Sequence, residues 1–196
     1  MPNWCNCNGT VIIAEKDYEA FKKMFHKHNR QTPLTKEECD NMFYRTFCDY
    51  IEEYTVEEGY LDLYFEFDCA WSFYGCMIEK PEGVVSKTIF DAIKELDIKR
   101  ISFDCREYGM QFMESFYFNK ETNECKYKSE DIPYYTNAIN EEYSGCYEED
   151  ASYYISDLCT TIEPKIIEDR PDTSINLFEY NVQEILGGAN NEVCST

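Results

Sequence analysis

Two cysteines and two histidines are the residues of this chain whose types and spacing could hold a metal ion. Cys5 and Cys7 stand in the opening MPNWCNC, and His26 and His28 follow in FHKHN. Zn²⁺ accepts two thiolates and two imidazoles in a tetrahedral site. Two thiols in a strand at this spacing share a face, but residues two apart on a helix are separated by about 200°, so one imidazole would face away. We therefore favour packing of Trp4 and the cysteines at the entry of a strand, and we expect no cofactor.

Carboxylates offer a second kind of site, one for Mg²⁺. The alternation in GYLDLYFEFDCAW predicts that Asp62, Glu66 and Asp68 share one face of a strand, and Asp104 and Glu114 fall on candidate neighbouring strands. Oxygen ligands of this kind suit Mg²⁺ and phosphoryl transfer or nuclease chemistry. No lysine or arginine constellation accompanies them, so a solvated acidic face is the favoured interpretation.

Other catalytic signatures are missing from the sequence. The glycines are scattered, with no phosphate-binding loop and no serine elbow, and a cysteine nucleophile would have only two histidines to draw on. We therefore predict that the protein is not an enzyme, with the Mg²⁺-dependent activity as the alternative.

The charge is strongly negative and unevenly placed. The 196 residues hold 18 Lys and Arg against 39 Asp and Glu, a formal net charge of −21, and residues 129–196 alone carry 15 acidic and 2 basic residues. Such a surface repels phosphate backbones and acidic lipid headgroups, and it attracts basic partners. We therefore expect no direct nucleic-acid binding and no membrane association.

Eleven cysteines raise the question of disulfides. The count is odd, no charged and apolar leader opens the chain, and 16% aromatic residues supply a large core without covalent staples. No apolar stretch approaches the roughly 18 residues that span a bilayer. These features predict reduced thiols and a soluble, cytoplasmic protein.

The hydrophobic pattern of the first 54 residues predicts a strand and two helices. Residues 9–14, GTVIIA, form an apolar run typical of a buried strand. Residues 15–30 predict an amphipathic helix that buries Tyr18, Phe21, Phe25 and His28 and exposes a basic stripe of Lys16, Lys23, Lys27 and Arg30. A capping box of Thr35 and Glu38 predicts a second helix over 35–54. Its buried face would hold Cys39, Phe43, Phe47, Tyr50 and Tyr54.

Later segments alternate between strand and helix patterns. Residues 59–71 give the clearest strand, Ser86 opens a helix, and strands follow around Ile101, over 111–118 and over 125–128, the last two as a hairpin. An apolar helix is expected in INLFEYNVQEIL, at 175–186. The pattern predicts an α+β fold: a mainly antiparallel sheet with helices on one face.

Three segments carry a resemblance to a known family. The opening MPNWCNCNGTVII, FDCAWS at 67–72 and EYGMQFMES at 107–115 resemble the YubB-like proteins of phages, plasmids and genomic islands. The resemblance covers about residues 1–119 and implies a ferredoxin-like α/β sandwich, with the helical insertion near 35–54. The tryptophan-rich segment that usually precedes the AWS strand in that family is absent here. Residues 120–196 would then be an acidic, Tyr-rich extension packed on that domain.

Acidity and origin together suggest a binding function. Alternate carboxylates on a strand repeat at about 6.6 Å, comparable with successive phosphates of a nucleic-acid strand. The candidate partner-binding residues are Glu52, Glu53, Glu57, Glu58, Asp62, Glu66, Asp68, Glu141, Glu142, Tyr147, Glu148, Glu149 and Asp150. We predict a non-enzymatic inhibitor from a mobile element that occupies the groove of a basic nucleic-acid-binding protein or ribonucleoprotein effector, such as a CRISPR complex. A homo-oligomeric scaffold protein is a further alternative, and the oligomeric state is left open.

Overall fold

A computed structural model describes residues 3–28, 31–56, 59–107, 112–131 and 175–187, which contain seven strands in one antiparallel sheet. The sheet order is β2-β3-β1-β4-β5-β6-β7. The strands are β1 (Trp4–Ala14), β2 (Thr46–Val56), β3 (Tyr60–Ala70), β4 (Ile98–Glu107), β5 (Phe112–Asn119), β6 (Glu124–Asp131) and β7 (Ile175–Glu179). The helical elements are η1 (Glu15–Asp17), α1 (Tyr18–Lys22), α2 (Lys36–Asp40), the π-helical turn η2 (Tyr74–Ile78), α3 (Ile89–Glu95) and α7 (Val182–Ile185).

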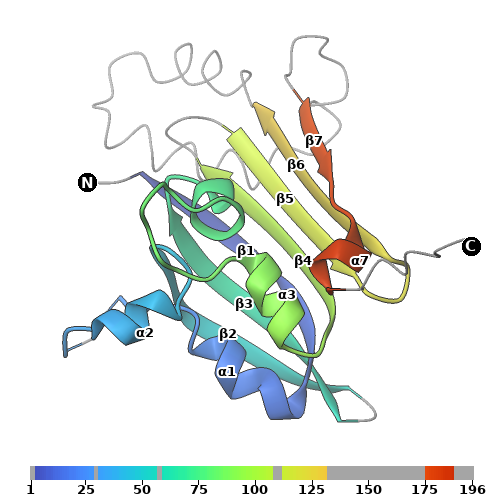
Figure 1. Cartoon of the computed structure of the whole chain (residues 1–196), viewed down its shortest axis with the longest axis horizontal. Coiled ribbons are helices and arrows are strands. Elements are labelled where there is room, and N and C mark those ends of the chain that lie inside the picture. Colours follow the sequence, from blue (N-terminus) through green and yellow to red (C-terminus); the bar gives the residue numbers. More distant parts are fainter. Residues whose placement is uncertain (1–2, 29–30, 57–58, 108–111, 132–174, 188–196) are drawn as a thin grey trace, which may run out of the picture.

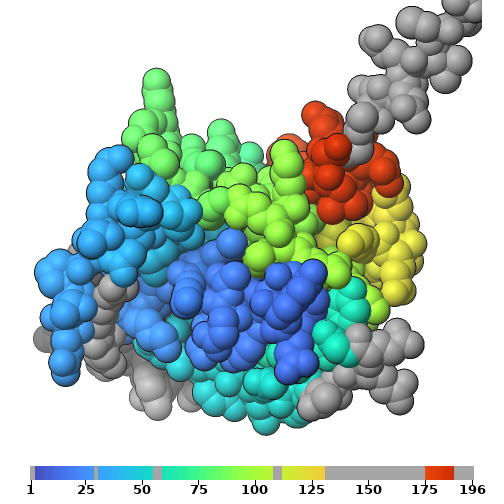
Figure 2. Space-filling model, turned by 60° about the horizontal axis from the view of Figure 1, so that its bottom comes forward, coloured from blue at the N-terminus to red at the C-terminus, as the bar shows by residue number. Residues whose placement is uncertain are grey.

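The helices α1, α3 and α7 lie on one side of the sheet (Figure 1). Figure 2 shows α1 in blue, α3 in green and α7 in red on the surface of that side. In the part of the chain that the structure describes, no helix covers the opposite side, which we call the open face. The predicted α+β class with helices on one face of an antiparallel sheet is therefore confirmed.

Buried and less buried side chains alternate along most of β1 and β3, which gives the sheet two different faces. Side chains at odd positions of these strands are buried under the helices, and the even positions point to the open face. Phe21 of α1, Phe65 of β3 and Phe103 of β4 lie within this core, where the Phe21 and Phe65 rings meet edge to face at 5.5 Å. The strand predicted over 59–71 is confirmed as β3, with Leu61, Leu63, Phe65 and Phe67 all on the helix side.

The first predicted helix is shorter than its hydrophobic pattern indicates. Helical structure ends at Lys22, because the following backbone turns to hydrogen-bond the chain around β2: the His26 amide donates to the Thr46 carbonyl at 2.8 Å. The helix predicted over 15–30 is wrong in its second half. His28 is not on a buried helix face, Lys23 and Lys27 follow the end of α1, and Arg30 lies outside the described residues.

The helix predicted over 35–54 is wrong beyond its first turn. The capping box of Thr35 and Glu38 is present and opens α2, but α2 ends at Asp40 and residues 46–56 form β2. A bulge lies between Cys48 and Tyr50, where the register with β3 shifts. Because a bulge inserts one residue, it places side chains three apart on the same face and imitates helical spacing.

Two other predicted helices also differ in extent. Thr88, not Ser86, caps α3, and its hydroxyl accepts a hydrogen bond from the Asp91 amide. The segment 175–186 begins as β7 and only then forms α7, because Ile175–Glu179 pairs with β6. The strands expected around Ile101 and over 111–118 and 125–128 are present as β4, β5 and β6. β6 and β7 continue the same sheet past residue 119, while most of the predicted acidic extension lies outside the described residues. None of the described helices is long and apolar enough to cross a membrane.

Gly9 lets β1 and β4 approach closely at the centre of the sheet. Its φ is +151°, and a Cβ added there would lie 1.9 Å from the Ser102 carbonyl oxygen. We expect Gly9→Ala to lower the free energy of unfolding by more than about 3 kcal/mol, since both backbone strain and overlap with main chain oppose it. Gly83→Ala, at φ +78° with no atom within 4 Å, is the control and should cost about 1 kcal/mol. Equal urea midpoints for the two variants would contradict this packing.

Candidate functional site

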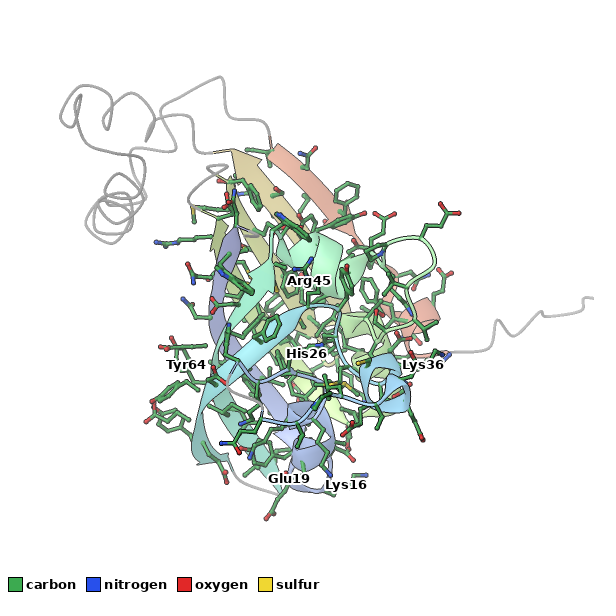
Figure 3. All side chains as sticks on the ribbon, turned by 90° about the vertical axis from the view of Figure 1, so that its left-hand side faces the viewer. Lys16, Glu19, His26, Lys36, Arg45 and Tyr64 are labelled. Atoms are coloured by element: carbon green, nitrogen blue, oxygen red, sulfur yellow. The ribbon has the colours of Figure 1, made fainter. Side chains whose placement is uncertain are left out.

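The open face of β2 and β3 carries alternating tyrosines and carboxylates. In the β2–β3 register Tyr50 lies opposite Glu66, Glu52 opposite Tyr64, and Tyr54 opposite Asp62. Tyrosine and carboxylate therefore alternate across the strands as well as along them. We call this set, together with Asp68, the β2–β3 patch: Tyr50, Glu52, Tyr54, Asp62, Tyr64, Glu66 and Asp68. Figure 3 shows Tyr64 projecting from this face, away from Lys36 of α2.

Hydrogen bonds within the β2–β3 patch join the two residue types. The Tyr50 hydroxyl donates to Glu52 at 3.2 Å, and the Tyr64 hydroxyl donates to Glu66 at 3.3 Å. The negative charge of Glu52 raises the pKa of Tyr50, and partial burial together with the charge of Glu66 raises that of Tyr64. Tyr50 and Tyr64 therefore stay neutral hydrogen-bond donors to these carboxylates.

The middle of the patch has no cationic partner among the described residues. In the described ranges no lysine, arginine or histidine forms an ion pair with Glu52, Asp62 or Glu66. Tyr50 and Tyr54 are 47% and 51% exposed, which is high for tyrosines in a sheet. The patch therefore offers both unneutralised charge and uncovered aromatic surface.

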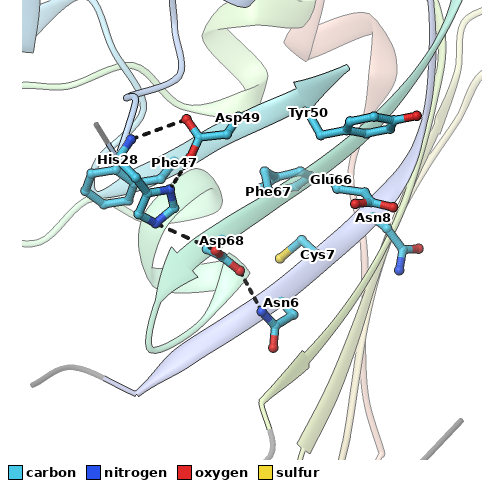
Figure 4. Close-up of a pocket in the computed structure, with 10 residues that line it drawn as sticks. All are labelled: Asn6, Cys7, Asn8, His28, Phe47, Asp49, Tyr50, Glu66, Phe67 and Asp68. Carbon is cyan, nitrogen blue, oxygen red and sulfur yellow. Dashed lines mark hydrogen bonds and ion pairs between the residues drawn. The ribbon is translucent and has the colours of Figure 1, made fainter. Parts of the chain in front are cut away.

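A pocket of about 360 Å³ opens at the end of the patch nearest the N-terminus of β1 (Figure 4). His28 lies between two carboxylates there: its Nδ1 is 2.8 Å from Asp49 Oδ2 and its Nε2 is 3.7 Å from Asp68 Oδ2. The Asn6 amide donates to Asp68 Oδ1 at 2.6 Å. Trp4 meets the His28 ring edge to face at 5.6 Å and Phe47 in the same way at 5.5 Å.

Burial and neighbouring groups act on the pKa of Asp68 in this pocket. Partial burial raises the pKa of Asp68, and the hydrogen bond from Asn6 and the charge of His28 counteract this. Glu66 and Tyr50 line the other end, beside Asn8 (Figure 4). Carboxylates, amides and aromatic rings thus face the same hollow.

The His28–Asp49 pair has the orientation of a catalytic dyad without a nucleophile to serve. Its Nε2 is directed at Asp68, and the one thiol that lines the pocket belongs to Cys7. Burial raises the pKa of the Cys7 thiol well above its ordinary value, which keeps it protonated and unreactive.

The residues considered for metals do not converge. Cys5 and Cys7 are buried on the helix side, whereas His28 lies on the open face, and the His26 Nε2 is 3.0 Å from the Phe43 carbonyl. Among the described residues no group of three His, Cys, Asp or Glu side chains could hold a metal ion.

The carboxylates considered for Mg²⁺ are likewise divided. Asp104 accepts a hydrogen bond from the Ser115 hydroxyl. β1 separates Asp104 on β4 from Glu66 on β3, since Asn8 of β1 pairs with both residues. Glu114, expected on a neighbouring strand, is on one, but its side chain lies on the helix-covered face, opposite to that of Asp62, because it alternates with Ser115.

The predicted partner-binding residues are placed in part. Glu52, Asp62, Glu66 and Asp68 share the open face, but Glu53 alternates to the other side, opposite Leu63. The following predicted residues lie outside the described ranges: Glu57, Glu58, Glu141, Glu142, Tyr147, Glu148, Glu149 and Asp150. Tyr50 and Tyr54 were expected on the buried face of a helix and instead lie on this surface, although tyrosine alternates with acid in both strands.

Glu114 is a buried carboxylate on the helix side that the sequence analysis did not expect there. It is 2% exposed and accepts hydrogen bonds from the Phe73 amide at 2.6 Å, the Tyr74 amide at 3.0 Å and the Tyr127 hydroxyl at 2.7 Å. Burial raises its pKa to about 7, although these donors oppose the shift. Glu114 therefore ties β5 to the start of η2 and to β6, which gives it a structural role.

Fold and site together define an α+β protein whose antiparallel sheet presents an acidic, tyrosine-rich patch on the face without described helices. Comparisons of the chain with family models, curated proteins and solved structures find no match. The functional argument therefore depends on the geometry of this chain.

Proposed function

We propose that the protein is a non-enzymatic binding protein that occupies the cationic groove of a nucleic-acid-binding protein by mimicking its charge. The observation that carries the proposal is the β2–β3 patch, where three carboxylates without a cationic partner in the described residues alternate with tyrosines. A groove built for phosphates supplies lysine and arginine at a matching density.

Spacing supports this kind of mimicry. Glu66 and Asp68 are two residues apart on one strand, about 6.6 Å along its axis, which is comparable with the distance between successive phosphates. The exposed tyrosines add flat area that interfaces use as anchors at low entropic cost. Long-range attraction from a net charge of −21 would accelerate encounter with a basic surface.

A mobile element is the proposed origin, and the host cytoplasm the proposed location. The order β2-β3-β1-β4, with α1 following β1 and α3 following β3, supports a ferredoxin-like unit such as the YubB-like resemblance implies. In this proposal residues 1–119 form that unit and residues 120–196 an acidic extension. The partner is a nuclease complex of host defence, such as a CRISPR effector or a restriction enzyme.

Affinity capture tests the proposal. The tagged full-length chain is incubated with a bacterial lysate that contains defence complexes, and the bound proteins are eluted with a salt gradient and identified. We expect a nucleic-acid-binding effector that is released as salt rises, because the attraction between exposed charges is screened. Retention of no basic protein would contradict the proposal.

A homo-oligomer is a second candidate, favoured by the cations elsewhere on the open face. Arg100 of β4 and Lys126 and Lys128 of β6 alternate with residues of the helix side and face the same way as the patch. One copy could therefore place its patch on the basic strands of another. Light scattering distinguishes the two functions, since a stable dimer at low concentration favours self-association and a monomer favours a foreign partner.

A further inference from the structure

We propose that the pocket between His28 and Tyr50 takes an arginine side chain of the partner. This inference rests on the proposed function and names the partner side chain that binds at one position of the surface. The pocket is lined by carboxylates, amides and aromatic rings from β1, β2 and β3, and its volume of about 360 Å³ is at the lower end for ligand sites, which suits one side chain.

Two carboxylates flank the space that the guanidinium would fill. Asp68 lies at the His28 end and Glu66 at the Tyr50 end, and both belong to the open face of β3 (Figure 4). A planar guanidinium has five N–H donors and can bond one carboxylate with each edge, whereas a lysine ammonium is a point charge that must choose one. A carboxylate at each end of the pocket thus favours arginine over lysine.

Neutral groups complete the match. The Tyr50 and Phe47 rings line the pocket, and aromatic faces stabilise a guanidinium by cation–π contact. The side-chain oxygens of Asn6 and Asn8 are further acceptors on the β1 side. A phosphate or another anion would meet Asp49, Glu66 and Asp68 together, so this hollow excludes the ligands that a basic pocket would take.

His28 fixes the Asp68 end of the pocket. Its Nδ1 is held by Asp49, and its Nε2 is directed at Asp68 Oδ2, while Asn6 holds Asp68 Oδ1. Asp68 is therefore oriented before a ligand arrives, which lowers the entropic cost of binding. Glu66 has only the Tyr64 hydroxyl as its hydrogen-bond donor among the described residues, so it retains acceptor capacity for the guanidinium.

Titration with two short peptides tests the proposal. The ¹⁵N-labelled full chain is titrated with acetyl-Gly-Arg-Gly-amide and with acetyl-Gly-Lys-Gly-amide at equal ionic strength, and the Asn6 and Asn8 side-chain amide signals are followed. We expect saturable shifts with the arginine peptide and an affinity roughly 10-fold lower for the lysine peptide. Equal affinities, or shifts that do not saturate, would overturn the assignment.

Matched variants separate the pocket from general acidity. Glu66→Gln with Asp68→Asn should weaken arginine-peptide binding at least about 10-fold, whereas Glu52→Gln with Asp62→Asn, which removes the same charge outside the pocket, should change it less than about 3-fold. Glu66→Gln alone serves as a second test if the pair disturbs folding, because its side chain is exposed. Equal losses from both pairs would overturn the pocket.

Failure of this inference is distinguishable from failure of the proposed function. If the peptide does not bind but the captured effector is still released by salt, the arginine pocket is wrong and charge mimicry stands. If neither the peptide nor a basic effector is retained, both are wrong.

Discussion

Converting Glu52, Asp62 and Glu66 to their amides should weaken binding to the captured effector about 100-fold at low salt. The estimate follows from a loss of roughly 1 kcal/mol for each neutralised carboxylate in contact with a cationic surface. The slope of affinity against salt concentration should also become shallower, because fewer ion pairs remain to be screened. Fluorescence anisotropy or calorimetry over a salt series provides the measurement.

A control of equal charge decides whether location matters. Glu37 in α2, Glu82 in the loop after η2 and Glu121 in the β5–β6 turn are exposed and lie outside the patch. Their replacement by glutamine removes the same three charges, so long-range attraction falls equally in both variants. We expect a loss of less than about 5-fold from the control. If the two triple variants weaken binding equally, the acidity acts through net charge and the patch has no special role.

Glu114→Gln should remove a large part of the pH dependence of stability. Burial raises the pKa of Glu114 from an ordinary 4.5 to about 7, so between these values the folded protein binds a proton that the unfolded chain has released. The free energy of unfolding therefore falls as pH rises from about 4.5 through 7. A shift of this size corresponds to about 3 kcal/mol.

Urea unfolding at pH 5 and pH 8 measures the effect. Glutamine is neutral at both pH values, so the stability of Glu114→Gln relative to the wild type should rise by about 2.5 kcal/mol between them. Loss of an acceptor for the Phe73 or Tyr74 amide adds an offset that does not depend on pH. Glu121→Gln, at an exposed position, is the control, and its free energy of unfolding should change with pH as that of the wild type does. A parallel curve for Glu114→Gln as well would show that Glu114 is ionised throughout.

Much of the fold could be predicted where apolar and polar residues repeat with a single, uninterrupted period. β3 alternates without interruption, and its faces are as the sequence indicates. The capping box of Thr35 and Glu38 locates the start of α2 because the signal is local. The class of the fold follows from these elements, since an alternating strand requires one covered face and the helices supply it.

β2 could not be predicted because two periodicities coincide there. The bulge places Phe47 opposite Asp68 and Tyr50 opposite Glu66, so these residues, three apart, face the same way as they would on a helix. The sequence analysis therefore placed Tyr50 and Tyr54 in a core, although both are exposed. Two of the seven residues of the patch were misplaced by this error, and only the pairing with β3 shows their position.

Glu114 was predictable in part. Its neighbours at the same parity, Phe112, Phe116 and Phe118, already place it on the apolar face of its strand. What the sequence does not show is the set of donors, since Phe73 and Tyr127 come from distant segments that only tertiary structure brings to β5.

Competition between the protein and nucleic acid for the captured effector tests charge mimicry most directly. Labelled DNA or RNA is bound to the purified effector, and the full chain is added while the bound fraction is followed. Complete displacement, at concentrations that match the affinity of the chain for the free effector, is the predicted result. A ternary complex, with nucleic acid still bound while the chain associates, would contradict it, since two ligands that share one groove cannot bind together.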